Sequence, residues 1–329
     1  MSVFSSVLRL ELRRCATLRR CAPAALCVLF SYASASSVLS SIVAIRGGDL
    51  PGRSAFDCFF VALNSDTVTS LLMPLGALFL VADMFSKDDG SDGLLALLRS
   101  KTRSTAILFL GKVAALGLAC LLYVFFAAIF MTLADMLLVG SLLSMTPSDW
   151  LAYSGDPADY LWNANGYRLA LIPRGWNYAL LVLALVLICS VCLAAFVLIG
   201  AGAASLVASR MNPLMLCGPV ILIMQMIPHM ASCLHFLMYP GEPFFDWGFL
   251  IDRFCLAYYC LGAGMGQSAV GQRALQALAD EQNIDLGTST FTLVDTPIVL
   301  IVLVAVMAVL GLILLVRAWK KDCMGGAGA

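Results

Sequence analysis

Two histidines are the residues of this chain that most suggest metal chemistry. His229 and His235 stand in one apolar run with methionines and a cysteine, and imidazole, thioether and thiolate ligands together suit copper. The two histidines are six positions apart, however, so on a helix they point to different sides. We therefore interpret them as packing residues and predict no metal site. The accompanying residues are Met224, Met226, Met230 and Cys233.

The other motifs that could serve catalysis or nucleotide binding are incomplete. Gly111-Lys112 is followed by Val113 and has no leading glycine, so it is not a phosphate-binding loop. Cys189 and Cys192 lie inside an apolar run, where cysteine packs as a small apolar residue. The apolar runs contain no glutamate, which a metalloprotease embedded in the membrane needs. We predict no catalytic residue and no cofactor on this chain.

Composition indicates a membrane protein. Of the 329 residues 61% are hydrophobic, whereas soluble domains are about 45–50% apolar. A helix needs roughly 20 apolar residues to cross about 30 Å of hydrocarbon. Six runs of suitable composition predict an all-α polytopic protein whose transmembrane domain covers residues 22–329. The predicted spans are 22–45, 67–84, 113–134, 177–208, 213–237 and 296–316.

The N-terminal segment 1–21 predicts an amphipathic helix that lies in the headgroup plane. Most of its apolar side chains fall on one side of a helix, and Arg9 and Arg13 fall on another. Glu11 and Arg14 do not fit this pattern, because both fall near the apolar side. The segment is therefore predicted to be a cytoplasmic interfacial helix with one unexplained feature.

Lysine and arginine predict the orientation of the spans. With both termini in the cytoplasm, the inner segments hold 14 of the 20 basic residues, as the positive-inside rule expects. The longest outer loop, about 239–295, contains an apolar stretch at 254–266 that is too short to span. That stretch predicts a re-entrant or interfacial segment before the last span, with an ordinary loop helix as the alternative.

The end of the fourth span and the residues that follow it carry two local predictions. The stretch 200–205, GAGAAS, suits close helix packing. Asn212-Pro213 is a strong helix interruption, which predicts a tight turn that sends the chain back.

Three residues are candidates for a translocation path or gate. Pro219 and Pro228 remove backbone donors and could kink the fifth span. Asp135 lies near the outer end of the third span, where a carboxylate is either solvated or lines the path.

Segment 83–112 is the only sizeable cytoplasmic loop in this topology, and nine of its thirty residues are charged. Its aspartates precede a helix expected to begin near Gly93, where the helix dipole favours anions. A short ridge of leucines follows, and cations end it. A partner's groove could bind such a ridge, whereas the alternative is a solvated loop with positive-inside charges. The predicted coupling residues are Asp88, Asp89, Asp92, Leu94, Leu97, Leu98, Arg99, Lys101 and Arg103.

The same segment resembles the loop between the second and third spans of ABC-2 type permeases, the membrane subunits of ABC transporters. The matching elements are an acidic, glycine-bearing start at 88–93, a leucine-rich helix at 94–98, a basic turn at 100–104 and a later lysine in Gly111-Lys112. The layout of an interfacial helix, six spans and a re-entrant-like outer segment is also similar. The chain departs from the family in having aspartate where glutamate is frequent and no proline before the basic turn.

This resemblance implies a permease subunit that forms the translocation path of an exporter in a bacterial cytoplasmic membrane. It also implies a separate ATP-binding subunit, docked on the coupling residues, and a second permease subunit, identical or related. No nucleic acid is expected as a partner. A membrane scaffold or sensor subunit without transport and an intramembrane enzyme are the alternatives.

Overall fold

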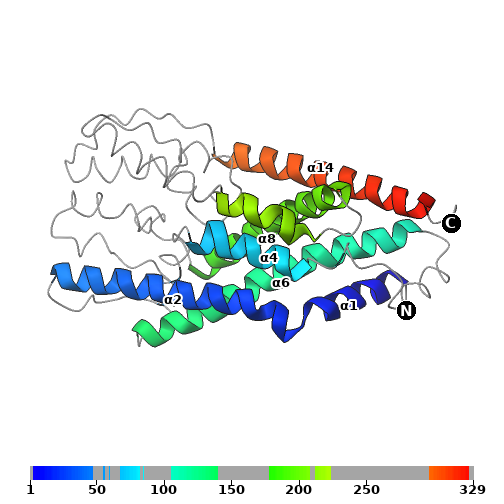
Figure 1. Cartoon of the computed structure of the whole chain (residues 1–329). Coiled ribbons are helices and arrows are strands. Elements are labelled where there is room, and N and C mark those ends of the chain that lie inside the picture. Colours follow the sequence, from blue (N-terminus) through cyan, green and yellow to red (C-terminus); the bar gives the residue numbers. More distant parts are fainter. Residues whose placement is uncertain are drawn as a thin grey trace, which may run out of the picture.

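The computed structural model describes residues 3–46, 55, 59, 67–81, 84, 105–139, 178–207, 212–223 and 296–325. Within this part of the chain all regular structure is helical, which confirms the predicted all-α class there. Figure 1 shows an elongated bundle in which α1 and the last turns of α14 lie at the same end. The helices are α1 (Val3–Cys15), α2 (Leu18–Arg46), the π-helix η1 (Thr67–Leu72), α4 (Met73–Val81), α6 (Thr105–Val139), α8 (Tyr178–Val207), a helix Pro213–Ile223 and α14 (Thr296–Gly325).

Three of the described helices are long and apolar enough to cross a membrane. They are the stretches Ala106–Leu138 of α6, Val186–Val207 of α8 and Ile301–Trp319 of α14. Shorter apolar helices cover Arg20–Ala33 and Pro213–Ile223. Each of the six predicted runs is helical over all or part of its length. The three long helices indicate a membrane protein.

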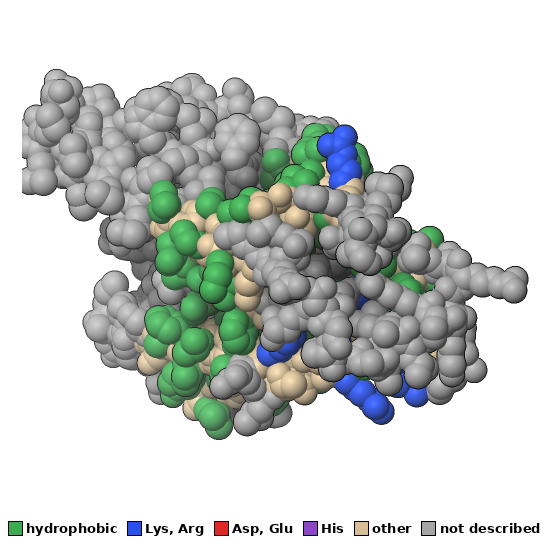
Figure 2. Space-filling view, turned by 45° about the vertical axis from the view of Figure 1, so that its right-hand side comes forward, with side chains coloured by type: hydrophobic (Ala, Val, Ile, Leu, Met, Phe, Trp, Pro, Cys, Tyr) green, Lys and Arg blue, Asp and Glu red, His purple; other side chains and the backbone are tan. Residues whose placement is uncertain are grey.

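The outward sides of these helices carry large hydrophobic side chains. Leu137 of α6 is 81% exposed, Ile301 of α14 is 68% exposed and Val191 of α8 is 57% exposed. Figure 2 shows such side chains gathered on one part of the described surface. A surface with this much contiguous apolar area suits hydrocarbon rather than water.

Two glycines allow α8 and α14 to pack backbone against backbone. A Cβ at Gly311 would lie 2.7 Å from the backbone nitrogen of Ile199, and one at Gly202 would lie 3.0 Å from the backbone oxygen of Gly311. No other residue type permits this approach, because every other side chain begins with a Cβ. The predicted close packing of residues 200–205 is therefore confirmed.

The predicted interruption after α8 is also confirmed. α8 ends at Val207, and the next helix begins at Pro213. Asn212 caps this helix, because its Oδ1 accepts a 2.9 Å hydrogen bond from the backbone N–H of Leu214. Proline is well suited to the first helical position, where a backbone N–H would have no partner within the helix.

α6 is the central helix of the described bundle. It has 35 residues, and at 1.5 Å per residue it is about 52 Å long, well beyond about 30 Å of hydrocarbon. It packs against α1, α2, α4 and α8 (Figure 1). α1 lies along its first turns, where a Cβ at Gly111 would be 3.0 Å from Cγ1 of Val7. Gly111 therefore lets α1 approach α6 closely.

Segment 1–21 contributes α1 and the beginning of α2. α1 buries Val7, Glu11 and Cys15, which lie one turn apart on the side that faces α6. The outer loop 239–295, with its apolar stretch, lies outside the described residues, as do both histidines.

Candidate functional site

Lys112 is the centre of a buried polar cluster at the place where segment 83–112 rejoins the bundle. Its side chain is 0% exposed, and its Nζ donates a 2.8 Å hydrogen bond to the backbone oxygen of Met84. Met84 stands at the start of the segment and Lys112 at its end. This one hydrogen bond therefore joins the two ends of the segment.

The charge of Lys112 is balanced by Glu11 of α1. Oε1 of Glu11 lies 3.9 Å from Nζ of Lys112, and both side chains are 0% exposed. Arg14, one turn further along α1, donates to the same Oε1 at 3.3 Å. Buried charges are tolerated when they are paired. The misfit of Glu11 in the amphipathic pattern is thus explained by a partner on another helix, and that of Arg14 by its ion pair with Glu11.

Trp319 brings α14 to the same cluster. Nζ of Lys112 lies 5.8 Å from the centroid of the Trp319 ring, within the range of a cation–π interaction. Phe109, almost one turn before Lys112 on α6, packs on Trp319 with ring centroids 5.8 Å apart and an angle of 56° between the planes. We call Glu11, Met84, Lys112 and Trp319 the anchor cluster.

A second group of contacts holds the last turn of α4, immediately before the segment. The backbone oxygen of Leu80 accepts hydrogen bonds from Nη1 of Arg20 at 3.2 Å and from Sγ of Cys15 at 3.5 Å. Carbonyl groups in the last turn of a helix lack donors within the helix and carry partial negative charge, so a guanidinium is a favourable partner. Burial raises the pKa of Cys15 to about 11, although Arg20 opposes this shift. The thiol therefore stays protonated at neutral pH and can donate.

Both groups of contacts hold helices together. They join α1, the beginning of α2, the end of α4, α6 and α14 around the two ends of segment 83–112. In the part of the chain that the structure describes, no three His, Cys, Asp or Glu side chains come together as a metal site. A displacement of either end of the segment would separate buried charges, so the surrounding helices would have to move with it.

The coupling residues themselves lie outside the described residues, so their predicted role stays a prediction. This applies to Asp88, Asp89, Asp92, Leu94, Leu97, Leu98, Arg99, Lys101 and Arg103. The anchor cluster was not predicted as a unit. The signal for it was the position of Glu11 on the apolar side of its helix, together with Lys112, which the sequence had marked only as part of a family motif.

The three candidates for a path or gate fall in different places. Asp135 is 0% exposed, and among the described residues neither of its carboxylate oxygens has a hydrogen-bond partner. Pro219 lies within helix Pro213–Ile223, where its side chain is exposed. Pro228 lies outside the described residues. A role in translocation stays a prediction for all three.

Comparison of the chain with protein-family models, with curated proteins and with solved structures finds no match.

Proposed function

We propose that this chain is the permease subunit of an ABC-2 type transporter, and that it serves export. The observation that carries the proposal is the anchor cluster, which ties both ends of the predicted docking loop to the bundle at one buried ammonium. The resemblance of segment 83–112 to the coupling loop of this family and the three apolar helices of spanning length support it.

The burial of Lys112 is the reason to assign the loop a mechanical role. Removing an ammonium from water costs several kcal/mol before any partner compensates for it. A solvated connection between two helices has no need of such an arrangement. A loop that receives force from a partner does need rigid ends, because flexible ends would absorb the motion.

The proposed mechanism follows the contacts of the anchor cluster. Closure of the ATP-binding subunits pushes on residues 83–103, and Lys112 passes this displacement to α6. Glu11 carries it to α1, and Trp319 carries it to α14, which is packed on α8 through its glycines. The spans then shift between inward and outward access. ATP is bound and hydrolysed on the partner chain.

The proposal includes six spans, with both termini on the cytoplasmic side of a bacterial plasma membrane. α2, the η1–α4 pair and a fifth span that begins with helix Pro213–Ile223 complete the count beside the three long helices. A second permease subunit, identical or related, supplies the other half of the path.

The test uses two loop variants of the tagged full-length chain. Leu94→Asp with Leu97→Asp removes two apolar anchors, each of which contributes on the order of 1–3 kcal/mol to docking. The expected loss of affinity is therefore roughly tenfold to ten-thousandfold, at 1.4 kcal/mol per decade. Reversal of Asp88, Asp89 and Asp92 to lysine is the comparison, and it should do less because exposed ion pairs contribute about 0–1 kcal/mol each.

The measurements are co-purification of an ATP-binding protein and ATP turnover in the assembled complex. Both variants should still insert into the membrane, since their apolar runs are unchanged. The proposal fails if no protein with a phosphate-binding loop co-purifies with the unmodified chain. It also fails if the leucine variant retains partner and turnover at the unmodified level.

A further inference from the structure

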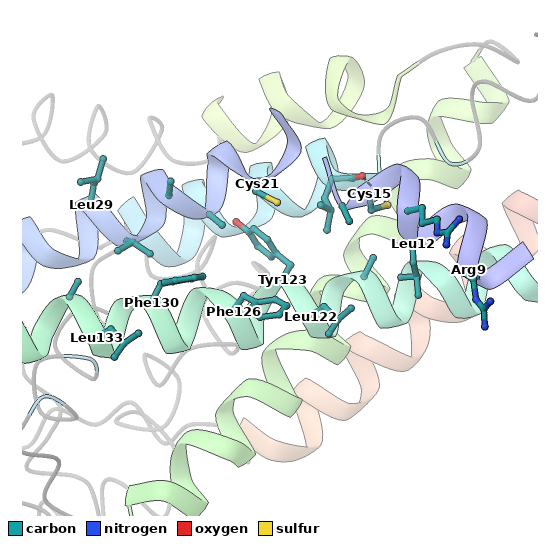
Figure 3. Close-up of a pocket in the computed structure, with 18 of the residues that line it drawn as sticks. Arg9, Leu12, Cys15, Cys21, Leu29, Leu122, Tyr123, Phe126, Phe130 and Leu133 are labelled. Carbon is teal, nitrogen blue, oxygen red and sulfur yellow. Dashed lines mark hydrogen bonds between the residues drawn. The ribbon is translucent and has the colours of Figure 1, made fainter. Parts of the chain in front are cut away.

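An apolar groove with a cationic end runs along α1, α2 and α6. It is open to the surface and has a volume of about 1290 Å³. Figure 3 shows its α6 wall as a row of large side chains, with Arg9 at one end of the groove and Leu29 and Leu133 toward the other. The residues of this row are Leu122, Tyr123, Phe126, Phe130 and Leu133.

The apolar part of the groove has a preformed wall. The hydroxyl of Tyr123 lies 3.5 Å from Sγ of Cys27 on α2 and packs over Gly76 of α4, where a Cβ would collide with it. Phe126 and Phe130 follow along α6 and are 49% and 54% exposed. Contacts with α2 and α4 thus fix Tyr123 in the wall, while Phe126 and Phe130 are open to an apolar occupant.

The charge in the groove stands at one end only. Arg9 and Arg13 both line it, both are exposed, and they are four residues apart on one face of α1. Like charges at this spacing repel each other, so an anion between them is favourable. Guanidinium groups also match the geometry of phosphate oxygens. The groove therefore combines a site for a phosphate with a long apolar channel.

We propose that this groove binds an anionic phospholipid from the leaflet on the side of α1. The headgroup phosphate lies at Arg9 and Arg13, and one acyl chain lies along Leu122 and Phe126. The α6 wall from Ala119 to Leu137 is about 27 Å long, whereas one leaflet contributes about 15 Å of hydrocarbon. The acyl chain therefore fills the half of the groove nearest to α1. Basic pockets between helices at a membrane face are known to bind anionic headgroups.

A second copy of this chain is the other occupant that the test must separate from a lipid. A second copy could cover the apolar wall, but it would need exposed acidic groups to face the two arginines. Among the side chains that the structure describes, the acidic ones, Glu11 and Asp135, are both buried. Arg317, which is exposed on α14 at the same end, would add like charge. This inference uses only α1, α2, α4 and α6 and does not depend on the proposed transport function.

The experiment is native mass spectrometry of the purified full-length chain in detergent. The chain is titrated with phosphatidylglycerol and, separately, with phosphatidylcholine that has the same acyl chains. Arg9→Gln with Arg13→Gln should weaken binding of phosphatidylglycerol by about thirtyfold, and each single change by about fivefold. Arg317→Gln is the matched control, because it removes an exposed arginine at the same end outside the groove.

Two further measurements separate headgroup from chain and lipid from protein. Ala25→Phe fills the groove without touching the arginines and should weaken binding of both lipids, while glycerol phosphate should not displace phosphatidylglycerol. Equal binding of the two lipids to the unmodified chain would overturn the proposal. It would also be overturned if the Arg9→Gln/Arg13→Gln variant bound phosphatidylglycerol as tightly as Arg317→Gln does. Displacement of phosphatidylglycerol by glycerol phosphate would overturn it as well. So would a dimer in which Cys21 of the groove is protected from labelling.

Discussion

Removal of the Lys112 charge should destabilise the chain more than any other single change to an arginine or lysine that the structure describes. At 3.9 Å and an effective dielectric constant of about 20, Glu11 and Lys112 attract each other by about 4 kcal/mol. Desolvation of the two buried ions offsets most of this attraction, so the intact pair adds little net stability. Removal of Lys112 is different, because it leaves the Glu11 carboxylate buried with the partly exposed Arg14 as its remaining charged partner. Lys112→Met should therefore lower the free energy of unfolding by about 3–5 kcal/mol.

The double variant distinguishes charge from shape. Glu11→Gln alone should cost less than Lys112→Met, because the ammonium keeps the carbonyl of Met84 and the ring of Trp319. Glu11→Gln combined with Lys112→Met leaves no buried charge in the pair and loses mainly the hydrogen bond to Met84, a cost of about 1–3 kcal/mol. The double variant is thus expected to be more stable than Lys112→Met alone.

The assay is thermal unfolding of the purified chain in detergent, followed by a thiol-reactive dye that reports the exposure of buried cysteines such as Cys120 and Cys189. A loss of 3–5 kcal/mol corresponds to a decrease in Tm of about 6–20 °C, at about 2–4 °C per kcal/mol. Arg317→Met, at an exposed position, is the control and should change stability by less than about 0.5 kcal/mol. The reasoning is refuted if Lys112→Met has the same Tm as the control. It is also refuted if the double variant loses as much free energy of unfolding as the two single changes together.

Four further predictions test other parts of the structure. Gly311→Ala should destabilise the chain by about 1–3 kcal/mol because its Cβ meets the α8 backbone, whereas Gly117→Ala, with nothing within 4 Å, should be neutral or stabilise by about 0.5–1 kcal/mol; equal Tm values would contradict this. A single-cysteine variant that retains Cys21 should react with a maleimide at pH 8, while one that retains Cys15 should not, since a pKa of about 11 leaves about one thiolate in a thousand. The raised pKa of Cys15 also predicts that stability decreases above about pH 9, because the unfolded chain loses this proton first, and the Cys15→Ser variant should show a smaller decrease than the unmodified chain. Asp135→Asn should keep or increase the Tm, and a decrease would reveal a partner for this carboxylate.

The features that were predictable from sequence are those encoded by neighbouring residues. The small residues at 200–205 predicted a close helix contact, and Asn212-Pro213 predicted an interruption between two helices, because both signals act within one or two turns. The glycine that α8 meets, Gly311, was not predicted. Its role depends on which helices become neighbours, and hydrophobic periodicity contains no information on that.

The anchor cluster was also not predictable, because it too depends on which helices become neighbours. The amphipathic pattern of segment 1–21 revealed that Glu11 was misplaced, but it did not reveal the partner, which is a lysine on a helix far along the chain. Lys112 was noticed for its place in a loop motif, where an exposed role is the ordinary expectation. The cationic end of the groove was not predictable either. In the sequence Arg9 and Arg13 form the polar side of an interfacial helix, and they line a groove only because α2 and α6 lie beside α1.

The wide separation of the anchor residues along the chain has a consequence for biosynthesis. Glu11 leaves the ribosome about 100 residues before Lys112, an interval of about 5–20 s at a synthesis rate of about 5–20 residues per second, and Trp319 follows about 200 residues later still. During translation α1 must therefore keep its carboxylate in water or among lipid headgroups. It can pack against α6 once Lys112 has been made, but the anchor cluster is complete only after the last helix has been made. The contact that joins the first and last helices is then among the final steps of maturation, so a nascent chain that stops before α14 would present an unsealed N-terminal helix to the quality-control proteases of the membrane.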